Sequence, residues 1–450
     1  MNLPADPLPT KFKGDTPEQY LERLLDFCKE YHWLIHVLAF NFITHKEWEK
    51  FSSDWQDALM NHMQQAGDEW AFAILELTKE SSDYSKWPPS LGLYLESIRD
   101  LALPRTTRQQ DQQKNISRHI RGGMSDKKVH EVELLSQLIK KVADQHNVSS
   151  IIDLGSGQGY LSRALAFECG FEVLAVDMSE VQTQGALRFD TKALRAQGKA
   201  KEHPNLKHVT EKVTPENITE VLNRCGSSTD KQWLVTGLHT CGDLSPMIFR
   251  LFAESQKVSC MVNVGCCYNA LTNQGFPMSS FLKNKSDMIH VGSTAKVLAC
   301  HSPSRWHEEG IQCIRAFDNY YFRALLMELL VKKGLADISD PPRLGRIKQN
   351  KAFVPFVKAS LKRLKLPENT ITEEEAQRHY LQAKERQVDK QFVALWILRG
   401  LLAPIIESII LMDRWLYLKE INGQTSKVWM YPLFDLDASP RNMVYVASKP

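Results

Sequence analysis

The chain has 450 residues, of which 43% are apolar and 24% are charged, and its formal net charge is +3. This ordinary globular composition predicts two or three domains that need no disulfide staples, and the net charge is too small to predict a polyanionic partner by itself. Nine scattered cysteines indicate a reducing compartment rather than a disulfide framework. The N-terminus shows no apolar secretory signal, so we expect an intracellular protein, cytoplasmic or nuclear.

The first part of the chain has a helical pattern. Apolar residues recur at three- and four-residue spacing from Thr16 to about residue 103, behind a Thr-Pro start. A polar and basic linker, 105–128, then runs into a helix that begins near Ser125. We therefore expect a helical N-terminal region over 1–118. Such helical regions are candidates for docking protein partners.

From residue 129 strands and helices alternate. This alternation predicts an α/β fold with a doubly wound parallel sheet, and we expect a further helix over 320–333. The predicted strands are 149–153, 171–176, 206–213, 232–238 and 258–264.

The C-terminal part changes character. Residues 335–420 are expected to form a helical insertion, and 428–450 show two β-rich runs around the turn ASPRN, which is typical of a hairpin. We expect this hairpin to return to the central sheet. The α/β domain would then be discontinuous, formed by 119–334 plus 421–450.

A basic segment lies inside the insertion. Residues 341–367 hold eight Lys or Arg and no acid, together with Phe353 and Phe356. Cations with interleaved aromatic rings can follow a nucleic-acid backbone and stack on its bases. The segment is therefore the candidate contact with RNA, and the alternative is an ordinary solvated face.

One apolar segment, 392–412, is long enough to span a bilayer. It also contains Arg399, Pro404 and Glu407. The free energy of insertion into a membrane is about −0.3 to −0.6 kcal/mol for each of a dozen apolar residues. This gain is roughly balanced by about 3 kcal/mol for each of the two charges and by the cost of the proline. We expect a buried helix with a proline kink. The alternatives are a membrane helix, which would make the protein membrane-associated, and a surface helix that docks a partner.

The sequence IIDLGSGQGYLSRALA, 151–166, carries the main functional motif. Asp153 ends a strand, and Gly155, Gly157 and Gly159 form a turn that opens a helix. Glycines let the backbone turn sharply and let a ligand approach the N–H groups closely. Asp177 ends the next strand, where an acid can accept both hydroxyl groups of a ribose.

Two cofactors fit this kind of unit. A nicotinamide dinucleotide favours G-x-G-x-x-G, whereas this turn has G-x-G-x-G with an acid two residues before it. An acid suits the cationic sulfonium and ammonium of S-adenosylmethionine, and D-x-G-x-G-x-G resembles the class I methyltransferase fingerprint. We therefore expect S-adenosylmethionine. Its candidate ligands are Lys128, Asp153, Gly155, Ser156, Gly157, Gly159, Tyr160, Asp177 and Leu238.

Two further loops should overhang the same crevice, because they follow the fourth and fifth strands. In TGLHTCGDLSP, His239 is a candidate base, and Asp243 either orients it or caps the next helix. In NVGCCYNALT, Asn263 and Tyr268 are candidates for the methyl-acceptor site. The alternative is that these side chains only brace their loops.

The pair Cys266-Cys267 has three possible roles: a covalent nucleophile, a metal site with Cys241, Cys300 and His301, or small packed thiols. The spacing lacks the C-x-x-C pattern of common zinc sites. We therefore expect packed thiols at a strand end and predict no metal ligand.

Taken together, these motifs resemble the methyltransferase-like protein 25 and 25B family. The resemblance rests on MSDKKVHEV, IIDLGSGQGYLSRALA, GLHTCGDLSP, NVGCCYNALT and PRNMVYVA, and it spans most of the chain. It implies a class I methyltransferase domain with a helical N-terminal extension, and S-adenosylmethionine as the cofactor.

The loops H-x-C-G-D-L and G-C-C-Y are also similar, more distantly, to loops of tRNA 2′-O-methyltransferases, which favours an RNA acceptor. Adenine dimethylases carry a short N-[LP]-P-Y motif, but Asn263 and Tyr268 are two residues farther apart than that motif allows. We therefore predict an S-adenosylmethionine-dependent methyltransferase with RNA as the favoured acceptor. The alternatives are a protein methyltransferase and a non-catalytic, methyltransferase-like interaction module.

Overall fold

The computed structural model describes residues 7–79, 81–107, 115–196, 198, 205–214, 216–225, 232–285, 291–345, 347, 352–422 and 427–449. The chain forms two compact units. Unit 1 consists of residues 1–27, 102–300 and 405–450, and unit 2 consists of 28–101 and 301–404. Both units are therefore discontinuous in sequence. The division of the chain at 118, 334 and 420 stays a prediction.

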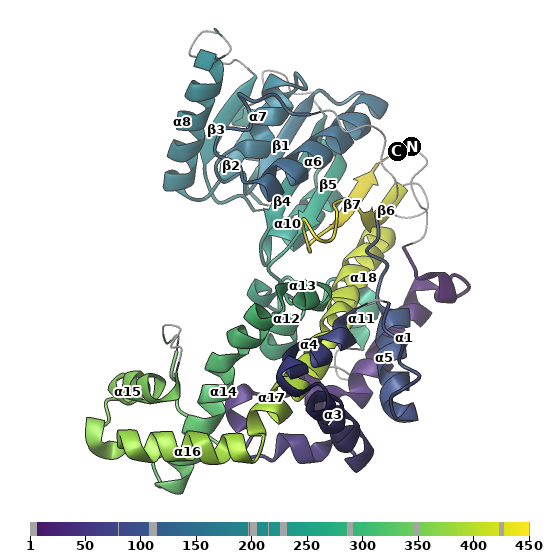
Figure 1. Cartoon of the computed structure of the whole chain (residues 1–450). Coiled ribbons are helices and arrows are strands. Elements are labelled where there is room, and N and C mark those ends of the chain that lie inside the picture. Colours follow the sequence, from purple (N-terminus) through teal and green to yellow (C-terminus); the bar gives the residue numbers. More distant parts are fainter. Residues whose placement is uncertain are drawn as a thin grey trace. The chain divides into compact units, whose positions relative to one another are not determined.

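Unit 1 is built on a seven-stranded sheet with the order β3-β2-β1-β4-β5-β7-β6 (Figure 1). The first five strands are parallel, and β7 is antiparallel to both of its neighbours. This confirms the predicted α/β fold with a doubly wound sheet. The strands are β1 Ser150–Leu154, β2 Glu172–Asp177, β3 Leu206–Thr210, β4 Trp233–Thr240, β5 Val258–Gly265, β6 Lys427–Pro432 and β7 Met443–Ser448.

The helices between the strands follow the predicted alternation of strands and helices. Helix α6 begins where expected, because the Ser125 side chain accepts a hydrogen bond from the Lys128 amide and so caps the first turn. The glycine turn ends at Gly159, after which α7 begins. The helices of this region are α6 Asp126–Gln145, α7 Tyr160–Phe167, α8 Glu180–Ala196, α9 Ile218–Cys225 and α10 Leu244–Glu254.

The sheet is covered on both faces, as its apolar strands require. Ile151 of β1 and Val262 of β5 belong to the same buried cluster as Leu135 of α6 and Leu165 of α7. On the other face, the ring of Phe249 in α10 packs edge-on against Tyr445 of β7, with 4.9 Å between ring centroids. Strands buried on both faces hold their carboxyl ends in fixed positions, and the candidate site lies at those ends.

The C-terminal hairpin completes the sheet, as predicted. Strand β7 pairs with β5 through Cys260 to Asn263 and with β6 along its whole length. All six residues of β7 are buried. Two short helices of unit 1 are α11 Ser280–Asn284 and α12 Ser293–Leu298. The division into units falls inside two further helices, α1 Pro17–Glu30 and α18 Ala403–Asn422.

Unit 2 is helical. Its helices include α2 His32–His36, α3 Ser53–Gln65, α4 Trp70–Leu75, α5 Pro89–Leu101, α13 Trp306–Glu309, α14 Ile311–Lys332, α15 Phe353–Leu364, α16 Glu373–Glu385 and α17 Val388–Leu401. Segments distant in sequence meet in this unit: the Tyr94 hydroxyl donates to the Leu398 carbonyl at 2.7 Å, and the rings of Phe42 and Phe392 lie 5.1 Å apart. The predicted helix 320–333 is part of α14, which starts nine residues earlier than predicted, at Ile311.

The apolar segment 392–412 forms the end of α17 and the start of α18, which are separated at Leu402. The stretch Val388–Ile421 is long and apolar enough to cross a membrane, but 94% of its most apolar window is buried inside the protein. Its two charges have protein partners: Arg399 donates to the Ile35 carbonyl, and Glu407 binds the Tyr268 hydroxyl and two arginines. These partners are what a buried helix of a globular core requires.

The basic segment differs from its prediction. Phe353 and Phe356 are buried at 2% and 0% exposure and pack against the Phe322 ring of α14, so neither ring is available for stacking on a base. The reason is amphipathic spacing, since Phe353, Phe356 and Val357 lie on one face of α15. The cations of α15 and the residue that follows it remain on the surface: Lys358, Lys362, Arg363 and Lys365.

Candidate active site

A cavity of about 410 Å³ opens at the carboxyl ends of β1, β2 and β4, in unit 1. This volume lies within the usual range for small-molecule sites. It is lined by Lys128, Asp153, Gly155, Ser156, Gly157, Gln158, Tyr160, Leu161, Asp177, Gln182, Leu238 and His239. The structure therefore brings together all the predicted cofactor ligands at one cavity except Gly159, which is the residue that caps α7.

The glycine turn is tied to the end of β2 by three backbone donors. The amides of Gly155 and Ser156 both donate to the Val176 carbonyl, and the Gly157 amide donates to Asp177 Oδ2 at 2.9 Å. Gly157 has a φ of +54°, which side-chain-bearing residues rarely adopt, and nothing lies within 4 Å of a Cβ built there. The backbone at Gly157 is thus open toward a ligand.

Each carboxylate oxygen of Asp177 already accepts one hydrogen bond from a backbone amide. Its Oδ1 accepts from the Ser179 amide at 2.8 Å, and its Oδ2 accepts from Gly157. Each carboxylate oxygen keeps a second lone pair for another donor. The carboxylate is therefore held in one orientation at the cavity and can still accept from the two hydroxyl groups of a ribose.

Asp153 lies under the turn and is only 2% exposed. Burial raises the pKa of its carboxyl group to about 6, although the hydrogen bond that it accepts from the Ser162 hydroxyl at 2.6 Å acts in the opposite direction. A buried carboxylate is stabilised by a nearby cation, so this position fits the positively charged end of S-adenosylmethionine. At the other side of the lining, Lys128 provides the charge that a carboxylate of the cofactor requires.

A buried ion-pair network braces the turn, and sequence reasoning missed it. Arg163 is 1% exposed; its Nη2 donates to the Gln158 carbonyl, and its Nε donates to Asp190 at 2.8 Å. The second carboxylate oxygen of Asp190 bonds His208 at 2.6 Å. An arginine among the apolar residues of a short helix is a sequence signal that would have pointed to this brace.

His239 stands at the cavity because β4 bulges there. The register between β4 and β5 shifts between Leu238 and Thr240, and His239 has a φ of +64°. Left-handed backbone at a non-glycine residue costs on the order of 1–3 kcal/mol and clusters at functional sites. The bulge turns His239 out of the strand pattern and toward the ligand cavity.

The partner of His239 is Glu131 of α6, not Asp243. His239 Nε2 lies 2.8 Å from Glu131 Oε2, and Glu131 has no exposed side-chain surface. Burial raises the pKa of Glu131, but the hydrogen bond and charge of His239, with Ser439 and Lys127, more than offset this and lower it. The Ser439 hydroxyl donates to Glu131 Oε1 at 2.7 Å, so the C-terminal hairpin also fixes this pair.

The expectation that Asp243 orients His239 is therefore wrong. Asp243 occupies the N-cap position of α10, as the alternative predicts, but its side chain does not act as the cap. The Asp243 carboxylate accepts from the amide and the hydroxyl of Thr272, at 2.9 and 2.5 Å, and caps no amide of α10. It ties the loop after β5 to the loop after β4. Although Asp243 lies only four residues from His239 in sequence, its carboxylate is already engaged by this second loop.

Asn263 and Tyr268 are buried and do not line the cavity. Asn263 is fully enclosed; it accepts from the Ser245 hydroxyl at 2.7 Å and donates to Thr240 Oγ1 at 3.1 Å. The Tyr268 hydroxyl donates to Glu407 Oε1 at 2.8 Å, and the residue is 1% exposed. Both side chains hold the loop after β5, which is the structural alternative considered for them. A role at the acceptor site stays a prediction.

The strand order, the glycine turn after β1 and the acid that ends β2 define unit 1 as a class I methyltransferase domain. A family described as "Methyltransferase domain" matches residues 127–274, which include the five parallel strands, the glycine turn and the acid that ends β2. Domains of this class use S-adenosylmethionine as the methyl donor, so the chain is an S-adenosylmethionine-dependent methyltransferase.

The chain is similar to the probable methyltransferase-like protein 25 of Homo sapiens, at 26% identity, over 72% of this chain and 75% of that protein. The corresponding protein of Mus musculus shows the same identity and coverage. These similarities confirm the resemblance to the methyltransferase-like protein 25 family.

Among solved structures, coclaurine N-methyltransferase bound to N-methylheliamine and S-adenosylhomocysteine shares 11% identity at a TM-score of 0.25, over 86% of this chain and 88% of that one. The TrmK protein of M. capricolum, bound to S-adenosylhomocysteine, shares 16% identity at a TM-score of 0.22, over 31% of this chain and 53% of that one.

Proposed function

We propose that this methyltransferase acts on RNA, at a hydroxyl or a protonated amine. S-adenosylmethionine, when bound, supplies an electrophilic methyl group on its sulfonium. An acceptor that carries a proton must lose it when it is methylated, and a base of the protein can take that proton. The observation that carries the proposal is the His239–Glu131 pair at the rim of the cofactor cavity.

The geometry of this pair assigns a role to each nitrogen of His239. When Nε2 carries the hydrogen and donates it to Glu131, the neutral ring has its lone pair on Nδ1. In the described part of the chain, Nδ1 has no hydrogen-bond partner. Nδ1 is thus the atom that would take the proton, and Glu131 is the positioning residue that holds the ring.

Two features support RNA as the acceptor class. The loops that contain His239 and Cys266-Cys267 are similar to loops of tRNA 2′-O-methyltransferases. In unit 2, α15 and the residue after it expose Lys358, Lys362, Arg363 and Lys365, and exposed cations are what binds a phosphate backbone. Of these, Lys358 pairs with Glu373, so the last three are the stronger candidates for phosphate contact.

The test uses the purified full chain and S-adenosylmethionine labelled in its methyl group. The chain is incubated with total RNA and, separately, with a protein lysate from cells that lack the enzyme. We expect label in the RNase-sensitive fraction, and we expect the His239→Asn variant to lose at least about 100-fold of it while it binds the cofactor normally. Label in a protease-sensitive fraction would replace RNA with a protein acceptor. Cofactor binding without labelling of either fraction would favour an interaction module.

The interaction with RNA has its own measurement. Replacing Lys362, Arg363 and Lys365 by Gln should weaken RNA binding and reduce the dependence of log K on log salt by about 0.7 for each phosphate that is no longer neutralised. Replacing Arg188, Lys192 and Arg195, three exposed cations of α8 in unit 1, by Gln is the matched control. An equal decrease in affinity for both variants would contradict a specific interaction through α15.

A further inference from the structure

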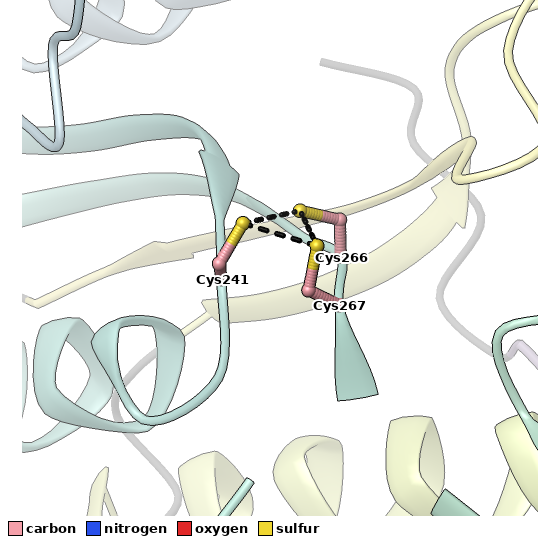
Figure 2. Close-up of side chains that lie close together, drawn as sticks. All are labelled: Cys241, Cys266 and Cys267. Atoms are coloured by element: carbon pink, nitrogen blue, oxygen red, sulfur yellow. Dashed lines mark hydrogen bonds between the residues drawn. The ribbon is translucent and has the colours of Figure 1, made fainter. Parts of the chain in front are cut away.

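Three cysteines from two loops converge at the carboxyl ends of β4 and β5 (Figure 2). Cys241 Sγ lies 3.3 Å from Cys266 Sγ and 3.1 Å from Cys267 Sγ, and the latter two sulfurs are 3.5 Å apart. The three sulfurs thus form a nearly equilateral triangle. Cys241 is exposed, Cys267 is half-buried and Cys266 is buried, so one side of the triangle faces solvent.

The distances between the three sulfurs fit coordination of one metal ion better than a disulfide bond. A disulfide would hold two of the sulfurs about 2.05 Å apart, and all three distances are more than about 1 Å longer. In a tetrahedral zinc site with Zn–S bonds of about 2.3 Å, the sulfurs are separated by about 3.8 Å. Each sulfur would need to move outward by only about 0.3 Å to reach this arrangement.

The three thiols could bind a cation together only as thiolates. A divalent cation placed between the three sulfurs would remove their protons, because a thiol that coordinates such an ion is deprotonated.

A buried arginine beside Gly265, the residue that precedes Cys266, is the independent observation. Arg414 of α18 is 1% exposed, and within the described residues none of its three guanidinium nitrogens has a hydrogen-bond partner. Its Nη1 would lie 2.5 Å from a Cβ on Gly265, the residue before Cys266, and its guanidinium lies 5.6 Å from the Tyr268 ring centroid. A buried cation without hydrogen bonds is costly, and the neighbouring Asp413 carboxylate offsets part of that cost. A further negative charge nearby would reduce it again.

We propose that Cys241, Cys266 and Cys267 form a binding site for a thiophilic divalent cation of the zinc type, with three thiolate ligands and an open fourth position toward solvent. Three thiolates and one Zn²⁺ carry a net charge of −1, which is the sign that Arg414 can stabilise. Sulfur-only ligands select zinc over Mg²⁺ or Ca²⁺, which prefer oxygen. Binding releases the protons of the thiols to solvent.

The experiment uses the full chain, purified under reducing, metal-free conditions and titrated with Zn²⁺ and with Co²⁺ as a spectroscopic probe. We expect one Zn²⁺ per chain, retained after dialysis at micromolar protein concentration, and Co²⁺ should show thiolate-to-metal charge-transfer absorption. No retained zinc, or Co²⁺ absorption without the thiolate bands, would overturn the site. A chain that loses two hydrogens on mass analysis, with Cys241 linked to Cys266 or Cys267, would show a redox pair instead.

Variants separate the site from general thiol binding. Cys241→Ser, Cys266→Ser and Cys267→Ser should each abolish stoichiometric zinc retention, whereas Cys169→Ser, a half-exposed cysteine outside the cluster, should leave it intact. Because Cys266 is buried and its variant can lose the fold, the exposed Cys241 decides the result. Retained zinc in folded Cys241→Ser would overturn the proposal. None of these readouts depends on methyl transfer, so failure of the metal site is distinguishable from failure of the proposed function.

Discussion

His239 Nε2 and Glu131 Oε2 lie 2.8 Å apart across 108 residues of sequence. One residue belongs to a bulge in β4 and the other to the buried face of α6. The bulge alone would leave the ring free to rotate, and the carboxylate fixes it in one tautomer and orientation. The pair therefore links the helix that carries Lys128, on the cofactor cavity, to the residue expected to accept a proton.

The Glu131→Gln substitution tests this link. It removes the charge that holds the His239 ring, so we expect methyl transfer to fall by about 10- to 100-fold while the cofactor Kd changes by less than about twofold. The measurement combines initial rates with calorimetric cofactor titration. Glu133→Gln is the control, because Glu133 lies on the same helix but bonds Arg121 and the Ile116 amide. Equal activity in Glu131→Gln and the parent would remove Glu131 from the site.

The Asp177→Ala substitution tests the cofactor assignment. Asp177 holds the Gly157 amide and has lone pairs free for the ribose, so its loss should weaken S-adenosylmethionine binding by at least about tenfold, as expected for charge-assisted hydrogen bonds. Isothermal titration of the purified chain gives the Kd. Glu180→Gln, an exposed acid three residues farther on, should leave it unchanged. An unaltered Kd in Asp177→Ala would show that this acid does not hold the cofactor.

Asp153→Asn should stabilise the cofactor-free protein in a pH-dependent way. The pKa of Asp153 is raised to about 6 by burial, so its protonated form contributes stability at low pH that is lost as the pH rises through about 6. The rise of the Asp153 pKa from 3.8 to about 6 corresponds to a destabilisation of the folded protein of about 3 kcal/mol at pH 8 and of about half this amount at pH 5.

Thermal unfolding of the parent and Asp153→Asn at both pH values measures this difference. The exposed Asp144→Asn on α6 should show no comparable change. A melting-temperature difference that is the same at pH 5 and pH 8 would contradict a raised pKa. The substitution should also weaken cofactor binding, because it removes the negative charge beside the glycine turn.

Tyr268→Phe separates structure from catalysis at the loop after β5. The variant loses the hydrogen bond to Glu407, whose other partners are Arg105 and Arg441, so the free energy of unfolding should fall by about 1–2 kcal/mol. Methyl transfer should stay within about twofold of the parent. Denaturant unfolding and initial rates measure the two effects. A folded Tyr268→Phe variant with a tenfold loss of activity would return Tyr268 to the acceptor site.

Much of unit 1 follows from local sequence pattern. The run Ile151–Leu154, the glycine turn and Asp177 lie within one strand–turn–helix–strand unit, and such units place their motifs without long-range information. The hairpin of β6 and β7 was also predictable, because a turn with proline and asparagine separates two β-rich runs. Its return to the central sheet was predictable too, because a β-rich pair at the end of an α/β chain needs a sheet to join.

The rest depends on tertiary contacts. Asp243 was expected beside His239 because it is near in sequence, whereas the actual partner, Glu131, could be found only from the packing of α6 on the sheet. The composition of 341–367 predicts a candidate nucleic-acid surface that includes Phe353 and Phe356, with a solvated face as the alternative. Their spacing with Val357 is itself helical, and this signal would have placed them in a core. The clustering of Cys241 with Cys266 and Cys267 depends on the alignment of β4 with β5.

The position of β7 between β5 and β6 has a consequence for synthesis of the protein. When the first 300 residues have emerged from the ribosome, all five parallel strands are present. Strand β5 then lacks the neighbour, β7, with which it pairs in the complete sheet. An unpaired apolar edge strand is a template for pairing with another chain. Until β7 emerges, the nascent chain is exposed to aggregation, so chaperone dependence should be greatest for fragments that stop between α14 and β7.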